Sequence, residues 1–280
     1  MRKLNIPSIV CKEKEIYTEC ACDFTGKPEY TRIALLYVDE VEKCSNGYTT
    51  YVPRSILGFP HIDIDNEDKK IIEKVYTQKF APEGSVGRKY YNIIVQNANN
   101  KCPICGGGKI KNLDHFLPKS KYPLLCVTPA NLIPTCRDCN LDKRTEISDD
   151  YYEIPFHPYF ETMNDKWVEC DLCFFTDKTY LLMYIVGYDK LLNPNMWRKY
   201  KAHMRITDLD ATFNSRASEE LDNVREMYKD ELMVCGKAKI ELSLIEVKNS
   251  AEKIDINSWK SALYRALIKK CDEFCNWLEI

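Results

Sequence analysis

The sequence CPICGGGKIKNLDHFLPKSKYPLLCVTPANLIPTCRDCN, residues 102–140, contains a Cys-x-x-Cys pair near each end. Thirty residues separate Cys102 and Cys105 from Cys136 and Cys139. Each pair can direct two thiolates at one ion, and two pairs complete the tetrahedral four-cysteine set that is typical of structural zinc. The glycines at 106–108 fit a tight turn after the first pair. The spacing therefore predicts a structural zinc site rather than four unrelated thiols.

The segment between the two pairs is longer than the roughly 15–20 residues of a plain zinc ribbon. Residues 113–117 are predicted to form a strand, residues 118–129 a loop, and residues 131–133 a returning strand. A helix is expected to start near Cys139. Zinc would then hold both ends of a β-β-α unit.

This unit resembles the HNH endonucleases, whose catalytic part is the ββα-metal fold. The resemblance is carried by DHFLPKS, YP, NLIP, CxxCNxxK and a later HPYF, and it extends from about residue 88 to residue 160. The LPKS, YP and HPYF combination is similar to nucleases of bacterial anti-phage systems, some of which are paired with an ATPase, as in Septu. The resemblance implies a metal-dependent endonuclease that hydrolyses phosphodiester bonds in nucleic acid, with DNA as the first expected substrate and RNA as the second.

The resemblance also implies a role for four residues of this stretch. His115 matches the general base, since an imidazole can take a proton from water near neutral pH. Asp114 matches a ligand of a catalytic Mg²⁺ or Mn²⁺ ion, for which oxygen ligands are expected. Asn131 matches the residue that ties down the loop and orients the base. Asn140 stands where many members have His, and its carbonyl oxygen can also bind Mg²⁺, so the metal preference stays open.

Positive charge is concentrated around this unit. Residues 101–145 hold eight Lys or Arg and three Asp, a net charge of +5 in a chain whose net charge is −2. A short basic segment in an otherwise acidic chain favours a local phosphate-binding site over a long positively charged groove for nucleic acid. Lys119, Lys143 and Arg144 are candidate phosphate contacts, with solvated surface positions as the alternative. Lys143 ranks first because it lies one helical step beyond Asn140.

The rest of the chain is predicted to be mainly helical. Residues 1–84 form an N-terminal accessory region, in which the runs IALLYVDEV and GYTTYVP predict short strands and Asn66 could cap a helix. Residues 85–160 are the predicted nuclease unit, and residues 161–280 show apolar spacing of three to four, typical of helices, from Pro194 onward. The expected fold is α+β, mainly α, with a zinc-clamped ββα-metal unit between helical flanks.

Several other residues could suggest further sites. Cys170 and Cys173 could form a third knuckle, but an alternating strand explains them more simply. His157 could donate to phosphate, although packing of the HPYF turn accounts for it equally well. His203 is expected on a helix surface, and the cysteines at 271 and 275 are expected in a helical core.

Composition limits the class of protein. Hydrophobic residues make up 45% and charged residues 29% of the chain, as in ordinary globular proteins. The sequence has no apolar run of about 18 residues, and its start, MRKLNIPSIVCKEKE, lacks the core of a signal peptide. A cytoplasmic protein with no membrane association is therefore expected, and its fourteen cysteines are expected to be thiols or metal ligands.

Two alternatives to a self-sufficient nuclease stay open. One is a catalytically idle zinc module that binds nucleic acid or a partner protein. The intact set of Asp114, His115, Asn131 and Asn140 argues against it, because a scaffold needs only the cysteines. The other is a nuclease whose activity depends on an ATPase or regulatory partner subunit, since the long flanks contain no recognisable recognition motif.

Overall fold

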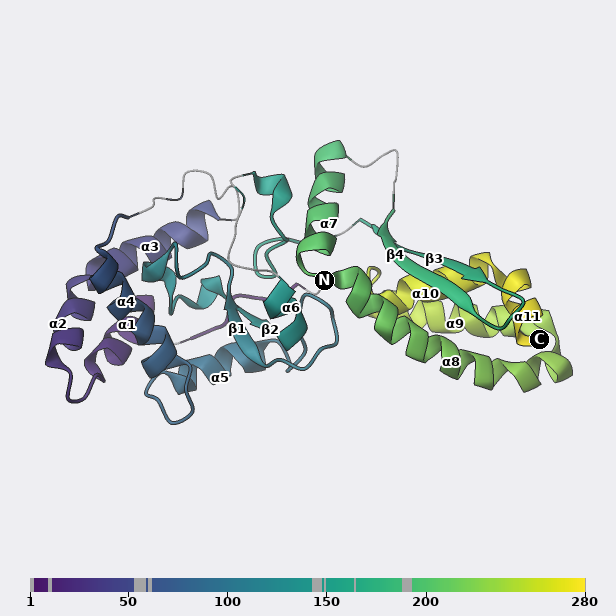
Figure 1. Cartoon of the computed structure of the whole chain (residues 1–280), viewed down its shortest axis with the longest axis horizontal. Coiled ribbons are helices and arrows are strands. Elements are labelled where there is room, and N and C mark those ends of the chain that lie inside the picture. Colours follow the sequence, from purple (N-terminus) through teal and green to yellow (C-terminus); the bar gives the residue numbers. More distant parts are fainter. Residues whose placement is uncertain are drawn as a thin grey trace. The chain divides into compact units, whose positions relative to one another are not determined.

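The computed structural model describes residues 3–9, 12–52, 59, 62–142, 148, 150–163, 165–187 and 193–279, with only the backbone at 141–142. The chain is divided into two compact units, Lys3–Thr162 and Met163–Ile280. Both are mainly helical, and each contains one two-stranded antiparallel sheet (Figure 1). The mainly α character of the fold is thus as expected.

The unit Lys3–Thr162 begins with helices and continues into the small sheet. Its first elements are the helices α1 (Glu13–Cys22), α2 (Pro28–Leu36), α3 (Val38–Tyr51) and α4 (Asn66–Lys74), the π-helix η1 (Val75–Phe80) and α5 (Arg88–Asn97). They are followed by strand β1 (Asn112–His115), strand β2 (Leu132–Thr135) and helix α6 (Arg137–Asp142), with single 3-10 turns at Pro123–Leu125, Pro129–Asn131 and Tyr151–Glu153. The expected β-β-α order of elements is present between residues 112 and 142.

The predicted N-terminal strands are wrong. The described residues of the runs IALLYVDEV and GYTTYVP lie in α2 and α3 and the turns beside them. In α3 the buried side chains are Val41, Cys44, Ser45 and Tyr48, which recur every three to four residues and so face one side of a helix. Burial of this face outweighs the β preference of single residues. The cap of α4 is Asp65, whose side chain accepts from the Glu67 N–H, rather than Asn66.

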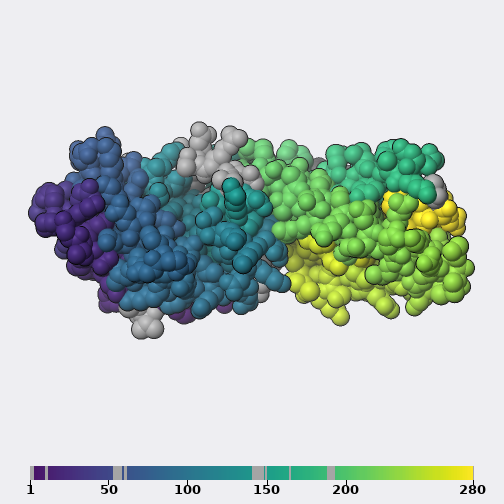
Figure 2. Space-filling model, turned by 60° about the horizontal axis from the view of Figure 1, so that its bottom comes forward, coloured from purple at the N-terminus to yellow at the C-terminus, as the bar shows by residue number. Residues whose placement is uncertain are grey.

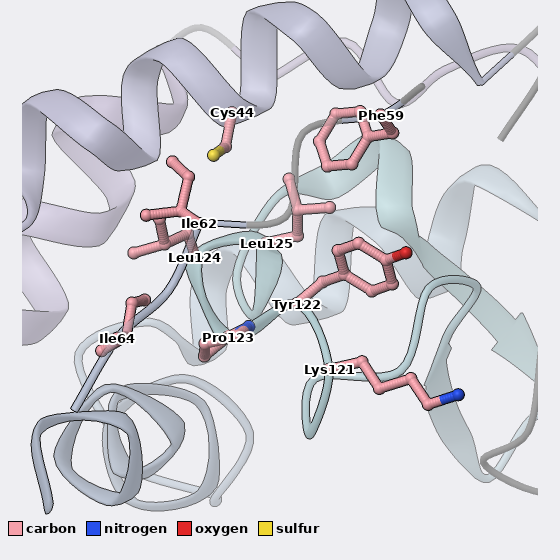
Figure 3. A pocket seen from close by; sticks show the side chains of 9 residues that line it. All are labelled: Cys44, Phe59, Ile62, Ile64, Lys121, Tyr122, Pro123, Leu124 and Leu125. Atoms are coloured by element: carbon pink, nitrogen blue, oxygen red, sulfur yellow. The ribbon is translucent and has the colours of Figure 1, made fainter. Parts of the chain in front are cut away.

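The N-terminal helices share one hydrophobic core with the β-β-α segment. Ser45 of α3 lies 2.7 Å from Thr128, hydroxyl to hydroxyl. Cys44 and Phe59 meet Leu125 and its neighbours in a small apolar junction (Figure 3). On the face shown in Figure 2, the early segments of this unit (purple and blue) lie directly against its later, teal segments. Residues 3–84 and 85–160, expected as separate regions, thus lie in the same compact unit.

The sheet of this unit sets the directions of the predicted site residues. Strands β1 and β2 are antiparallel, with Asp114 opposite Ile133 and His115 opposite Leu132. One residue further on, the Phe116 N–H donates to the Asn131 carbonyl at 2.9 Å. Successive side chains of a strand alternate in direction. Asp114 is accordingly half-buried and His115 is buried.

The unit Met163–Ile280 is a β-hairpin packed against helices. It contains strands β3 (Val168–Phe174) and β4 (Tyr180–Val186) and helices α7 (Pro194–Ile206), α8 (Leu209–Cys235), α9 (Lys237–Ile254), α10 (Trp259–Lys269) and α11 (Cys271–Glu279). Cys170 and Cys173 lie on β3 as expected for an alternating strand, and Cys271 and Cys275 are buried on α11. His203 is fully buried on α7, so its expected surface position is wrong.

None of the helices in the described ranges is both long and apolar enough to cross a membrane.

Candidate functional site

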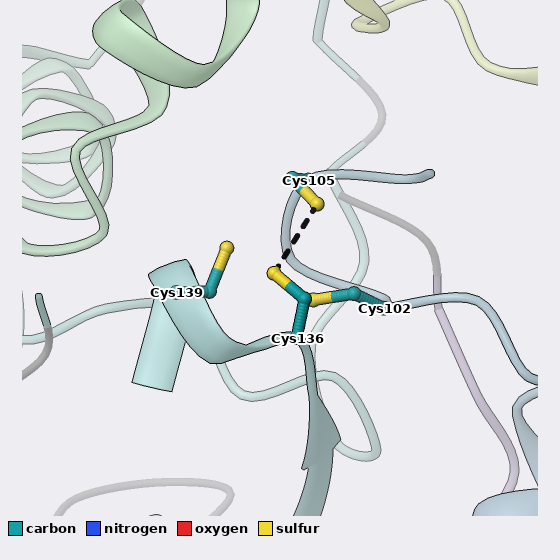
Figure 4. A group of neighbouring side chains, drawn as sticks. All are labelled: Cys102, Cys105, Cys136 and Cys139. Atoms are coloured by element: carbon teal, nitrogen blue, oxygen red, sulfur yellow. Dashed lines mark hydrogen bonds between the residues drawn. The ribbon is translucent and has the colours of Figure 1, made fainter. Parts of the chain in front are cut away.

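Four buried cysteines form a compact thiol cluster. The sulfur atoms of Cys102, Cys105, Cys136 and Cys139 all lie within 4.8 Å of one another (Figure 4). The Cys105 and Cys136 sulfurs are 3.9 Å apart. Zinc bound to four thiolates at about 2.3 Å requires sulfur separations of about 3.8 Å. The donor type, number and spacing therefore fit a tetrahedral zinc ion, and this group could hold one.

The turn after Cys105 is built around glycines. The Cys102 N–H donates to the Gly108 carbonyl at 2.8 Å, and the Gly108 N–H points to the Cys105 sulfur at 3.3 Å. Gly106 has φ +73°, in the left-handed region. A Cβ on Gly108 would lie 2.7 Å from Cys136 Cβ and 2.9 Å from its sulfur.

The same unit contains an open cleft of about 540 Å³. Asp114 and His115 from β1 and Asn140 from α6 all line it. The remaining lining side chains come mostly from the segment before α5, from α5 itself and from the ends of β1: Tyr76, Ala81, Pro82, Arg88, Tyr91, Lys111, Asn112, Leu113 and Lys119. Three of the four predicted catalytic residues are thus brought to one cleft.

His115 has a defined ring orientation. Its Nε2 lies 2.9 Å from the Cys126 carbonyl oxygen. A carbonyl oxygen only accepts, so Nε2 carries the proton and donates it to this bond. In the neutral ring Nδ1 is then the nitrogen with the lone pair. The residue is only 8% exposed and lines the cleft.

Asn131 does not line the cleft but holds the loop that fixes His115. It is fully buried. Its Oδ1 accepts from the Leu117 N–H at 2.8 Å, and its Nδ2 donates to the carbonyls of Leu117 at 3.2 Å and Leu125 at 3.4 Å. Leu125 precedes Cys126, whose carbonyl binds His115. The contacts give Asn131 a clear means of positioning the imidazole through the loop.

The cleft is positively charged, but its cations are only partly those expected. Lys119 lines it, whereas Lys143 and Arg144 lie outside the described residues. Two lining cations were missed by sequence reasoning, Lys111 and Arg88. Arg88 stands at the start of α5, and no local pattern relates it to His115, because the two meet only in the folded chain.

The Arg88 guanidinium is held by several neighbours, among them the Ala81 carbonyl, to which its Nη1 donates. It lies over the Tyr91 ring at 4.1 Å, and its Nε donates to Asn92 Oδ1 at 3.0 Å. It also pairs with Glu83 at 2.5 Å, a carboxylate that is 81% exposed. Exposed ion pairs contribute little to stability. A substrate phosphate could therefore replace Glu83 at small cost.

His157 packs behind the site rather than in the cleft. It is 1% exposed, and its ring lies 4.2 Å from the Phe116 ring, centre to centre. Its Nδ1 accepts from the Tyr159 N–H at 3.2 Å, so in the neutral ring Nε2 donates to the Tyr48 hydroxyl at 2.9 Å. Of the two roles considered for His157, the contacts support packing of the HPYF turn.

Comparisons with known proteins give two relatives. The chain is 28% identical to protein ea31 of Escherichia phage lambda, over 75% of this chain and 76% of that protein. It is also 36% identical to Septu protein PtuB of Bacillus thuringiensis. The matched segment covers 31% of this chain and 38% of that protein. The sequence matches no protein family model, and no solved structure matches it. The chain is thus similar to a phage protein along most of its length, and to a Septu protein along about a third of it.

Proposed function

We propose that this protein is a metal-dependent nuclease of the HNH type that hydrolyses phosphodiester bonds in nucleic acid, with DNA as the first substrate to test. The observation that carries the proposal is the cleft itself. Asp114, His115 and Asn140 line it together with Arg88, Lys111 and Lys119. A histidine, a carboxylate, an amide and three cations that line one open cleft match the needs of phosphodiester hydrolysis.

In the proposed reaction His115 acts as the general base. Its Nδ1 takes a proton from a water molecule while the water oxygen attacks phosphorus. The bond from phosphorus to one ester oxygen then breaks, and that oxygen receives a proton from solvent. The Nε2–H bond to Cys126 keeps the ring oriented and stabilises the imidazolium that forms, because a carbonyl accepts more strongly from a charged donor.

Asp114 and Asn140 are the proposed ligands of the catalytic metal. They supply a carboxylate and an amide oxygen, the ligand types that Mg²⁺ and Mn²⁺ prefer. When bound, such an ion stabilises the negative charge that develops on the phosphate oxygens. Two protein ligands leave most positions to water and substrate, so binding is expected to be weak and exchangeable. The four cysteines hold zinc as a structural ion and take no part in the reaction.

The test uses supercoiled plasmid and the purified full-length chain with Mg²⁺ or Mn²⁺. We expect cleavage that brief EDTA treatment stops before zinc is lost, and that added Mg²⁺ or Mn²⁺ restores. His115→Ala should lower the rate by about 10²–10⁴, as loss of a general base does. Zinc content should not change, although burial of the ring predicts a lower melting temperature.

Two outcomes of this test contradict the proposal. An idle zinc module would bind plasmid with no metal-dependent cleavage, in either the wild type or the variant. Cleavage that is unchanged in a folded His115→Ala chain would remove His115 from the reaction. If the wild type cleaves only when a second protein is added, the nuclease is the effector of a larger assembly.

We further propose that the nuclease acts in anti-phage defence with an ATPase or regulatory partner. The similarity to Septu protein PtuB supports this role, over the part of the chain that it covers. Expression of the gene with its neighbouring genes should protect bacteria against phage, and the His115→Ala version should not. Equal plaque counts with both versions would contradict the defence role while leaving the nuclease proposal standing.

A further inference from the structure

Tyr76 contacts the proposed base from the N-terminal part of the chain. Its ring meets the His115 ring in a T-shaped arrangement, with centres 4.4 Å apart and planes at 72°. Its hydroxyl donates to the Leu113 carbonyl at 3.0 Å. One side chain thus touches both the His115 ring and the strand that carries it. Tyr76 also lines the cleft.

The strand leaves this carbonyl available for Tyr76. The Phe116 N–H donates to the Asn131 carbonyl, and hydrogen-bonding positions alternate along an antiparallel ladder. Leu113 and Pro134 are therefore a pair without mutual hydrogen bonds, which is also why a proline is tolerated there. The Leu113 carbonyl points away from β2, and the Tyr76 hydroxyl satisfies it.

Tyr76 is placed by an unusual helix. It lies in the π-helix η1, where the Ala81 N–H donates to the Tyr76 carbonyl at 2.9 Å, a spacing of five residues. Such widened turns are rare and occur often at functional sites. The Tyr76 ring stacks on Phe80, which is fully buried, so the tyrosine has little freedom to turn.

From these contacts we infer that Tyr76 is a positioning residue for His115, supplied by a segment outside the β-β-α unit. The Cys126 carbonyl fixes the His115 ring at Nε2, and the Tyr76 ring limits rotation of the imidazole plane about that bond. Together they hold the ring in the orientation in which His115 lines the cleft. The catalytic consequence rests on the proposed function, but the effect on the His115 ring does not.

The first measurement is the tautomer of His115, because it reports the ring directly. The chain has only four histidines, so ¹⁵N-histidine labelling gives a small set of signals. In the zinc-loaded wild type we expect a single Nε2–H form for His115. In Tyr76→Leu we expect a mixture with the Nδ1–H form, and in Tyr76→Phe, which keeps the ring, the wild-type form.

Cleavage is measured on the same three proteins under single-turnover conditions with plasmid and Mg²⁺. The rate constant should fall about tenfold in Tyr76→Leu, as expected when a catalytic group is misplaced by a fraction of an ångström. Plasmid affinity should stay unchanged, and Tyr76→Phe should recover most of the rate. A merely structural tyrosine would change the melting temperature without changing the His115 tautomer.

Tyr159→Leu is the matched control. Tyr159 is also buried, and its hydroxyl donates to the Leu132 carbonyl of β2 at 2.9 Å, so its loss should destabilise the same sheet. We expect this variant to keep the Nε2–H form of His115 and, in the folded chain, the wild-type rate. If Tyr76→Leu does not fold, Tyr76→Met, which keeps apolar volume without a ring, replaces it with the same expected result.

The outcomes separate the two proposals. A wild-type His115 tautomer in a folded Tyr76→Leu or Tyr76→Met chain overturns the positioning role, whatever the activity. A mixed tautomer in a chain whose wild type does not cleave DNA or RNA supports the positioning of His115 but contradicts the nuclease. A shifted tautomer in Tyr159→Leu as well would show a general loosening of the sheet, and would also overturn the specific role of Tyr76.

Discussion

At the scale of single residues, the three histidines within the described ranges differ in their neighbours rather than in burial. His115, His157 and His203 are all buried. His157 is enclosed by aromatic rings, and burial on α7 holds the pKa of His203 well below its usual range. His115 alone of the three lines the cleft beside Asp114. The proposed role of His115 therefore depends on its position in the cleft. Burial alone does not distinguish it from His157 and His203.

Two lysines of one loop offer a direct test of the phosphate contacts. Lys119 lines the cleft, whereas Lys121 lies beside the apolar junction (Figure 3). A lysine that contacts phosphate releases about one counterion when DNA binds. Lys119→Ala should therefore weaken plasmid binding and reduce the salt dependence of the affinity by about one unit of slope.

Lys121→Ala removes the same charge two residues away and should leave both quantities near the wild-type values. Binding is measured by fluorescence anisotropy with a labelled duplex at several salt concentrations. Equal losses in the two variants would mean that the overall charge of the loop matters and that Lys119 makes no specific contact.

At the scale of elements, the site depends on short segments whose backbone conformation must be kept closely for the site to form. The turn after Cys105 must bring backbone against the second cysteine pair, and the loop before β2 must present the Cys126 carbonyl to His115. Neither segment is regular secondary structure. Each is fixed by hydrogen bonds to buried groups, so substitutions there should affect the site before they affect the surrounding helices.

Two of the three glycines that follow Cys105, Gly106 and Gly108, should differ in their effect on zinc binding. Gly108→Ala places a methyl group 2.7 Å from Cys136 Cβ, so the second pair must move away and zinc binding should weaken strongly. Gly106→Ala meets no atom within 4 Å but adopts φ +73°, which costs about 1 kcal/mol for a residue with a side chain.

The measurement is the zinc content of each variant after dialysis against a competing chelator. We expect Gly106→Ala to keep one zinc per chain and Gly108→Ala to lose most of it. Equal retention in both would show that the contact between the two knuckles is not tight.

At the scale of the whole molecule, the chain contains two compact units. The thiol cluster, the cleft and the N-terminal helices all belong to the unit Lys3–Thr162. The described part of the unit Met163–Ile280 has its own hairpin and five helices, and it contains no cluster of metal-ligand side chains. Loss of zinc should therefore destabilise the unit Lys3–Thr162 more than the unit Met163–Ile280.

Removal of zinc with a strong chelator should expose amides of the first unit to hydrogen exchange. Binding of a structural zinc ion contributes on the order of 10 kcal/mol in small zinc domains, so β1, β2 and α6 should lose protection first. Helices α8 to α11 should keep their protection. Hydrogen exchange with mass spectrometry measures both in one sample, and a uniform loss along the chain would contradict this division.

The sequence by itself determined the parts of the protein that depend on local spacing. Two Cys-x-x-Cys pairs predict the thiol cluster, because two residues between cysteines suffice to direct both sulfurs at one point. The predicted order strand, loop, strand, helix is present between residues 112 and 142, and the helices from Pro194 onward agree with the apolar spacing. The prediction of N-terminal strands was wrong because the β-prone residues of these runs are also spaced so that a helix can bury one face. Which of the two structures forms depends on packing against the rest of the core.

Only the tertiary structure decided what surrounds His115. The Cys126 carbonyl, the Tyr76 ring and the Arg88 guanidinium lie 11, 39 and 27 positions away in sequence, and each belongs to a different segment. Their approach depends on how α4, η1 and α5 pack against the sheet, and such packing is set by the whole core rather than by any local pattern. Sequence therefore names the candidate base, and the fold fixes its orientation, its charge environment and the segment that holds it.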